Sequence, residues 1–157
     1  MKNLKETINK IKQTVDATFT DEFKYFTIEE LCRSEKAKEC NIDNTPTEKQ
    51  KVYMRLLIIN ILDPLREKYG KSIWVNSGFR SEELNIAVGG SLTSHHRCRD
   101  GYAAADITRK NKQENIKLFN LIQEMNLPFC QLILENGGQW VHVSFNPKDI
   151  RREVLEL

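Results

Sequence analysis

Apolar residues recur three or four positions apart through residues 1–18, and charged or amide residues fill the positions between them. This spacing predicts an amphipathic helix, because residues three and four apart lie on the same helix face. We expect residues 1–24 to form a helical arm and residues 25–157 to form the main domain. The arm either packs on that domain or mediates association, and packing is the simpler interpretation. Its apolar positions are Leu4, Ile8, Ile11 and Val15.

Two helices are predicted in the first half of the main domain. A short helix begins at Thr27, where Thr27-x-x-Glu30 forms a capping-box pattern. A longer helix begins at Thr47 and runs to about Tyr69, and the glycine that follows is a suitable end. Pro64 is expected to kink this helix or to start a new turn, because proline lacks a backbone N–H.

Two more helices are predicted further along the chain. Glu82–Val88 forms a short helix that two glycines end. Asn111–Met125 forms a longer one with helical periodicity. The residues of this longer helix that we expect to point inward are Ile116, Phe119, Leu121 and Ile122.

Four segments are predicted to be β-strands, because β-branched, aromatic or small apolar residues dominate them. The last two are separated by Asn-Gly-Gly, which favours a hairpin. The fold class is therefore α+β, with N-terminal helices packed on a small, mainly antiparallel sheet. The predicted strands are Lys71–Ser77, Ala103–Thr108, Phe129–Glu135 and Gln139–Phe145.

Size and charge exclude several classes of protein. The 157 residues suit one main domain with a real core. The net charge of +2 gives no reason to expect a nucleic-acid partner. No stretch approaches the ~18 apolar residues of a membrane span, so we expect no membrane insertion. The charged N-terminus lacks the apolar region of a signal peptide, so we expect the chain to stay in the cytoplasm unless something releases it. We also expect it to be a monomer.

The four cysteines form no C-x-x-C pair, which argues against a thiolate zinc knuckle. We expect reduced thiols in a chain without a signal peptide. Cys130 falls in an apolar run and is expected in the core. Cys98 falls near the candidate site described next, where its thiolate could touch a metal.

The three histidines of the chain lie in only two segments, as His95 and His96 together and as His142 in a predicted strand. Two histidines and one aspartate are normal zinc ligands and leave a fourth position open for water. Zinc in such a site lowers the pKa of water to ~7 and polarises a carbonyl group. Histidine placement alone leaves an ordinary polar loop and a half-exposed strand as the alternative.

Short motifs around these histidines make the pattern more specific. In order along the chain, the main motifs are Ser77-Gly78-Phe79-Arg80-Ser81, Leu84-Asn85, Val88-Gly89-Gly90, Ser94-His95-His96, Gly101-Tyr102-Ala103-Ala104-Ala105-Asp106-Ile107 and Trp140-Val141-His142-Val143-Ser144. With these motifs in this order, the chain resembles the zinc D-Ala-D-Ala carboxypeptidase-like peptidases, the M15 group, and within it the single-domain branch encoded by phages and bacteria. The resemblance covers roughly Tyr25 to Phe145, includes Phe26–Leu31 and Asn41–Pro46, and implies a hedgehog/DD-peptidase-like zinc fold.

The resemblance implies a role for each motif residue. It implies that His96, Asp106 and His142 bind Zn²⁺. It implies that Arg80 holds a substrate carbonyl or carboxylate, a task that suits a forked guanidinium, although a surface salt bridge is the alternative. Ser94 either bonds substrate or caps its loop, and Trp140 is expected to pack in the core beside the site.

The first departure from the family pattern concerns the loop before Asp106. The pattern places the aspartate seven positions after the first histidine, whereas Asp106 follows His96 by ten. His95 therefore remains an alternative to His96, and Asp100 an alternative to Asp106. Adjacent residues on an extended segment point to opposite sides, so only one of the two histidines should reach the metal.

The second departure concerns the general base. Many relatives have glutamate three residues before the last histidine, but Gln139 occupies that position here and cannot accept a proton. Glu135 ends the preceding predicted strand and is our candidate base, because proton transfer needs a carboxylate within reach of the attacking water. The alternative is that Glu135 is a solvated turn residue.

The function implied is a zinc-dependent peptidase that hydrolyses the stem peptide of peptidoglycan, as a D-Ala-D-Ala carboxypeptidase or as an endolysin-type endopeptidase. Phage lysis, or transport as a virion component, would bring it to the cell wall. Two alternatives keep the zinc without the reaction: a non-catalytic module that binds wall peptide or a partner, which the glutamine at position 139 favours, and a purely structural zinc site.

Overall fold

The computed structural model describes residue 6 and residues 23–157. The predicted helical arm lies almost wholly outside the described residues, so both the arm and the domain boundary at residue 24 stay predictions. Within the described residues, no helix combines the length and the apolar character needed to cross a membrane.

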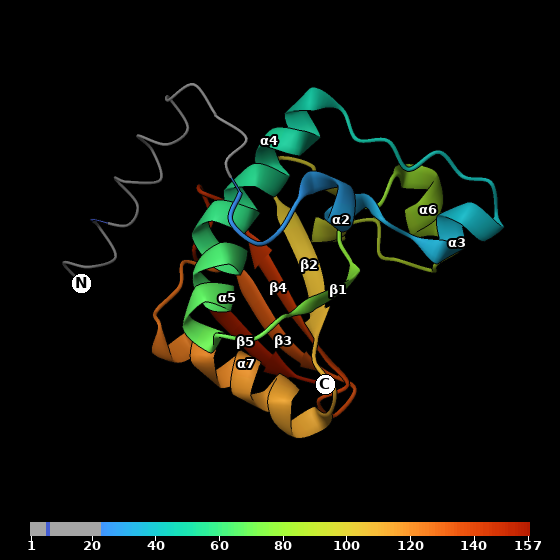
Figure 1. Cartoon of the computed structure of the whole chain (residues 1–157). Helices are drawn as coiled ribbons and strands as arrows, with labels where there is room; N and C mark the ends of the chain where they lie inside the picture. The colour runs from blue at the N-terminus through green and yellow to red at the C-terminus, as the bar shows by residue number, and fades with distance from the viewer. Residues whose placement is uncertain (1–5, 7–22) are drawn as a thin grey trace.

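The helices lie mostly in the first half of the described chain (Figure 1). Those predicted at Thr27, Thr47, Glu82 and Asn111 are all present, and a second short helix follows the first. The helices are α2 (Ile28–Cys32), α3 (Glu35–Glu39), α4 (Glu48–Leu57), the π-helical turn η1 (Ile58–Leu62), α5 (Asp63–Tyr69), α6 (Glu82–Ala87), the 3₁₀ turn η2 (His95–Arg97) and α7 (Lys112–Glu124).

The long helix of α4, η1 and α5 begins and ends as its sequence predicts. Thr47 caps it through a reciprocal capping box with Gln50, and Gly70 ends it with a φ of 75°. The helix continues through Pro64, but the turn before this residue is not regular α-helix. The π-helical turn η1 immediately precedes it, which is a wider turn that adapts the helix to a residue without an N–H.

Five strands form one mixed sheet in the order β1-β2-β4-β3-β5. Three neighbouring pairs are antiparallel, as expected, and β3 pairs with β5 in parallel. The β5 strand was not predicted, because its short, half-exposed sequence Glu-Val-Leu-Glu has little apolar character. The strands are β1 (Trp74–Ser77), β2 (Ala103–Thr108), β3 (Gln131–Glu135), β4 (Trp140–Phe145) and β5 (Glu153–Glu156).

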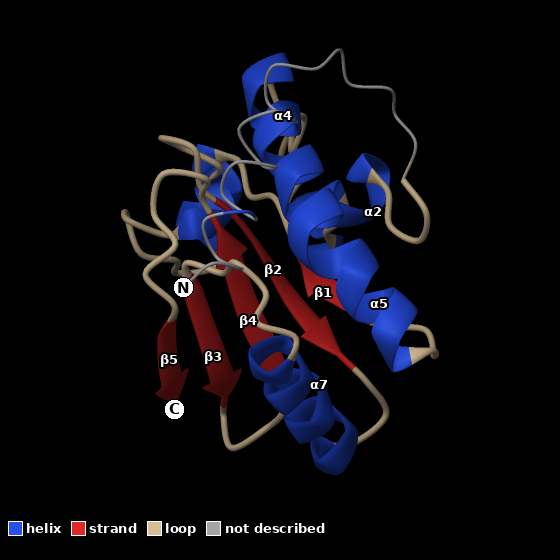
Figure 2. Cartoon of the chain, turned by 90° about the vertical axis from the view of Figure 1, so that its left-hand side faces the viewer, coloured by secondary structure: helices blue, strands red, loops and turns tan. Residues whose placement is uncertain are grey.

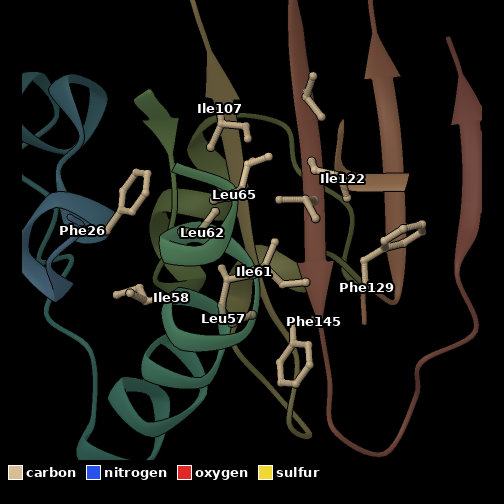
Figure 3. Close-up of a cluster of buried hydrophobic side chains, with 14 of the residues drawn as sticks. Phe26, Leu57, Ile58, Ile61, Leu62, Leu65, Ile107, Ile122, Phe129 and Phe145 are labelled. Carbon is tan, nitrogen blue, oxygen red and sulfur yellow. The ribbon is translucent and has the colours of Figure 1, made fainter. Parts of the chain in front are cut away.

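The sheet has one face in the core and one face free of the long helices. Helices α4, α5 and α7 all lie on the same side of it (Figure 2). Because successive strand residues point to opposite faces, Ile107, Val141 and Val143 face these helices and are fully buried. Figure 3 shows this packing, with Leu57, Ile61 and other residues of the long helix directed toward the strands. The alternate residues, which include Asp106 and His142, project from the other face.

One part of the predicted core is wrong. Ile116 was expected to point inward from α7 but is 39% exposed. Asn115 takes the buried position, where its amide donates to the backbone carbonyls of Gly138 and Gln139. This bond between the helix and the β3–β4 turn helps to fix the rotation of α7, so Leu118 enters the core in place of Ile116, while Phe119 and Ile122 are buried as predicted. The pattern of apolar residues could not reveal this position, because the residue buried there, Asn115, is polar.

Candidate metal centre

Asp106 and His142 are neighbours because β2 and β4 pair in register. The two residues lie directly opposite each other, so their side chains leave the same face of the sheet close together. Small residues precede Asp106 on β2, and Ala103–Ala105 are buried. The strand can therefore pass through the centre of the sheet and still present a carboxylate at its open face.

His96 reaches the same place from the 3₁₀ turn η2. Ser94 caps this turn by accepting a hydrogen bond from the His96 N–H. The His96 carbonyl accepts from the Arg80 backbone N–H at 2.9 Å. The ring is fixed by Nδ1, which lies 2.7 Å from the carbonyl oxygen of Gly78. A carbonyl can only accept, so Nδ1 carries the proton and Nε2 of the neutral ring presents a lone pair.

Three ligand atoms form a triangle at this point. His96 Nε2 lies 3.1 Å from Asp106 Oδ1 and 3.2 Å from His142 Nδ1, and the third side is 3.0 Å. Four-coordinate zinc with bonds of ~2.0–2.1 Å would set such atoms roughly 3.3 Å apart. The lone pair of His96 also faces the carboxylate, which is unfavourable unless a cation or a proton lies between them. The residues present therefore fit a zinc ion.

Burial and charge suit these groups to metal binding. All three are buried or nearly so. Burial raises the pKa of Asp106, but the two imidazoles beside it outweigh that effect and hold the pKa well below its usual range. Burial lowers the pKa of His142. The carboxylate is thus ionised and His142 favours its neutral form, which are the states that bind metal.

The alternative ligands of the sequence lie elsewhere. His95 is on the same 3₁₀ turn, not on an extended segment as expected, and bonds Ser144 through Nδ1 at 2.9 Å. Cys98 is packed in the hydrophobic core. Asp100 lies at the cavity described below. In the part of the chain that the structure describes, only His96, Asp106 and His142 are close enough together to share a metal.

Arg80 lies beside the triangle and is largely buried. Its Nε donates to Ser77 Oγ at 3.0 Å, and one terminal nitrogen donates to Asp106 Oδ2 at 3.3 Å. Oδ2 is the oxygen that does not face the histidines, so Arg80 holds the carboxylate with Oδ1 toward the metal position. None of the described residues accepts a hydrogen bond from its other terminal nitrogen, which leaves a donor for a ligand.

A cavity of about 820 Å³ opens over the triangle. Arg80, Ser94 and Glu135 all line it, so the structure brings every predicted site residue to one place. Trp140 also lines it and is partly exposed, which corrects the expectation that it packs in the core. Gln139 is exposed and is not part of the lining. Position 139 therefore faces away from the place where a base is needed.

Several lining residues were not singled out from the sequence, namely Tyr102, Gln131 and Arg151. Tyr102 lies inside a recognised motif but stacks on His95, with ring centroids 4.1 Å apart. Arg151 follows the last recognised motif and reaches the cavity only because β5 returns beside β3. No motif in the sequence predicts that β5 pairs beside β3.

A comparison with protein families agrees with this geometry. The family model described as Peptidase M15 matches residues 24–144, well over half of the chain. The chain therefore belongs to the M15 peptidase family, whose members are zinc peptidases. Membership supports a metallopeptidase acting on a peptide substrate, and the His–Asp–His cluster could bind its metal. A search of curated proteins found no match.

Proposed function

We propose that this protein is a zinc-dependent peptidase that hydrolyses the stem peptide of peptidoglycan, with His96, Asp106 and His142 as the zinc ligands. The observation that carries the proposal is the triangle of three ligand atoms at an open cavity, with a guanidinium and a carboxylate beside it. A zinc ion held there would activate water and polarise the substrate carbonyl.

Arg80 binds and orients the substrate in this proposal. Its free terminal nitrogen points a charge-assisted donor at the cavity while its bonds to Ser77 and Asp106 fix the rest of the group. A donor held in this way can stabilise negative charge that develops on the carbonyl oxygen during attack. The buried pair with Asp106 distinguishes Arg80 from a surface salt bridge.

Glu135 is the proposed general base. It ends β3 opposite Trp140, on the same face of the sheet as Ile133 and His142, and it lines the cavity. Burial lowers the pKa of His142, and the Glu135 carboxylate is close enough to oppose that shift in part. From this position Glu135 takes a proton from the attacking water and passes it to the leaving amine. The placement of Gln139 removes the main argument for a non-catalytic module, since that residue does not face the cavity.

The substrate class rests on the family and on charge. Four arginines and three carboxylates line the cavity, and one of those carboxylates, Asp106, is committed to the metal position and Arg80. Arg97 and Arg99 both pair with Glu82 outside the lining, which leaves Arg80 and Arg151 to meet the anionic groups of a peptide such as the stem peptide. We propose that the enzyme reaches the wall after phage lysis or as part of a virion.

Digestion of purified peptidoglycan tests the proposal. The zinc-loaded protein should release free D-Ala if it is a carboxypeptidase, or new amino termini if it is an endopeptidase. A chelator should abolish either product, and added zinc should restore it. Asp106→Ala serves as the matched inactive control. Full zinc occupancy with no product from several wall types would reject the proposed function.

A further inference from the structure

The cavity wall on the far side of the metal triangle from Arg80 is made by His95 and Arg151. Sheet order separates the two walls, because Arg80 contacts β1 and β2 whereas His95 contacts β4 and Arg151 contacts β5. Neighbouring strands lie about 4.8 Å apart, and β5 is three strand spacings from β2 and four from β1, so Arg80 and Arg151 flank a span of roughly 14–19 Å. That span matches about four to six residues of extended peptide.

His95 is held so that one nitrogen is presented to the cavity. Ser144 is fully buried, and its Oγ accepts a hydrogen bond from the Gln131 N–H at 3.2 Å. The hydroxyl proton of a buried serine needs an acceptor, and Nδ1 of His95 lies 2.9 Å from Oγ. With Nδ1 accepting, Nε2 carries the proton of the ring. No described residue accepts from Nε2, and His95 lines the cavity.

Tyr102 and Asp149 fix the rest of this wall. The rings of His95 and Tyr102 are nearly parallel, with an interplanar angle of 9°. The Tyr102 hydroxyl donates to Asp149 Oδ2 at 2.8 Å. The same oxygen accepts from Arg151 and from the thiol of Cys130. These contacts join the histidine and the arginine into one supported unit.

Arg151 offers its remaining donors to the cavity. Its two terminal nitrogens contact Asp149 and Glu153, the latter at 3.4 Å. The side chain is still 45% exposed and lines the cavity, whereas neither acidic partner does. A guanidinium has five N–H donors in its plane. The contacts with Asp149 and Glu153 use two of them, which leaves N–H donors at its edge for a planar anion. The residue lies outside the family match over residues 24–144.

We propose that His95 and Arg151 form a second substrate subsite, which receives a free carboxylate of the peptide on the side of the metal away from Arg80. This inference rests on the proposed function, which supplies the peptide substrate. Two carboxylates of a stem peptide have the required chemistry: the terminal one and the α-carboxylate of a γ-linked D-glutamate. Both would be bound by charge-assisted hydrogen bonds, and experiment distinguishes them.

Three synthetic stem peptides are used to test the proposed subsite. One carries both carboxylates, one has its terminus as an amide, and one has the glutamate α-carboxylate as an amide. KM and kcat are measured for wild type and for Arg151→Gln, and calorimetry measures binding of the same peptides to the zinc-loaded proteins. Lys148→Gln is the matched control, because it removes a positive charge from the same connection at an exposed position outside the cavity lining.

Wild type should favour the acid over one of the two amides by about tenfold or more in KM, with little change in kcat. Arg151→Gln should lose that preference, and Lys148→Gln should keep it. His95→Ala should weaken binding of the same peptide, and His95→Gln, which retains an N–H donor, should recover part of it. Zinc content should match wild type in all four variants.

The two proposals fail in different ways. Equal binding of acid and both amides by wild type would overturn the subsite, as would an unchanged preference in Arg151→Gln. Absence of cleavage of any peptide would count against the peptidase function, and calorimetry would still test the subsite. The amide that loses affinity identifies which carboxylate is bound.

Discussion

The carbonyl oxygen of Gly78 lies 2.7 Å from Nδ1 of His96 and so decides which nitrogen of that ring faces the metal position. Gly78 is itself held against α2, since a Cβ at this position would lie 2.3 Å from the backbone oxygen of Leu31. The adjacent Phe79 N–H donates to the same Leu31 oxygen at 2.7 Å. The glycine thus lets α2 approach closely and places the carbonyl that orients His96.

Gly78→Ala should reduce both stability and zinc affinity. The clash is with backbone, which cannot swing aside, so we expect a loss of about 2–4 kcal/mol in the free energy of unfolding. The displaced carbonyl should weaken zinc binding by about 10–100-fold, as is typical when a ligand loses its orienting partner. Chemical denaturation and zinc competition with a chelating dye measure the two effects.

Gly89→Ala is the control for the effect of losing a glycine. Gly89 has a φ of 69° with open space around its Cβ position, so the substitution adds strain of about 1 kcal/mol without a clash. Its zinc affinity should equal that of wild type. Normal zinc affinity in Gly78→Ala would show that the carbonyl does not orient His96.

Alanine at each of the two adjacent histidines should separate their roles. His96→Ala removes one side of the ligand triangle and should weaken zinc binding by more than about 100-fold, beyond the effect of losing an orienting partner. His95→Ala should retain stoichiometric zinc, because His95 bonds Ser144 and not the triangle. Elemental analysis after dialysis gives the ratio of zinc to protein. Loss of zinc from His95→Ala but not from His96→Ala would show that His95, and not His96, is the metal ligand.

Glu135→Gln should leave zinc bound and remove turnover. Loss of a general base costs about 10²–10⁴ in kcat, and a neutral amide of the same shape keeps the strand pairing with Trp140. Gln139→Glu in the same background is the informative companion. Because position 139 lies outside the cavity lining, a glutamate there should not restore activity. Restored activity would show that a general base can act from position 139.

Removal of zinc should leave the domain folded. The apolar core lies on the opposite face of the sheet and contains none of the three ligands. Zinc at about 1,000 times its dissociation constant contributes roughly 4 kcal/mol, so a chelator should lower Tm by roughly 10 °C in a domain of this size. Circular dichroism with and without chelator follows the transition. Complete unfolding on metal removal would instead support a structural zinc.

Local sequence chemistry predicted most helices and the first four strands, β1 to β4. Caps at Thr27 and Thr47, the glycine at position 70 and the Asn-Gly turn each act through neighbours in the chain, so a sequence pattern can reveal them. The β5 strand was missed because it depends on pairing with β3 across a long connection. The exposure of Ile116 was missed because a buried polar residue, Asn115, takes the inward position on α7.

The ordered motifs predicted which residues meet at the site, but not how the choice between His95 and His96 is made. The segment is a 3₁₀ turn, so alternation along an extended strand does not apply. The choice depends instead on two distant acceptors, the Gly78 carbonyl for one ring and the Ser144 hydroxyl for the other. Contacts that span eighteen and forty-nine positions cannot be derived from local spacing.

The alternation along β4 has a consequence for how correctly folded molecules can be recognised. Val141, His142 and Val143 are consecutive, with the valines in the core and the histidine at the metal position. Slippage of β4 by one residue against β2 would turn His142 into the core and expose both valines. Such a molecule could not assemble the zinc site. Stoichiometric zinc uptake is therefore a direct assay of strand register, and it should report misfolded protein in a preparation before any loss of solubility does.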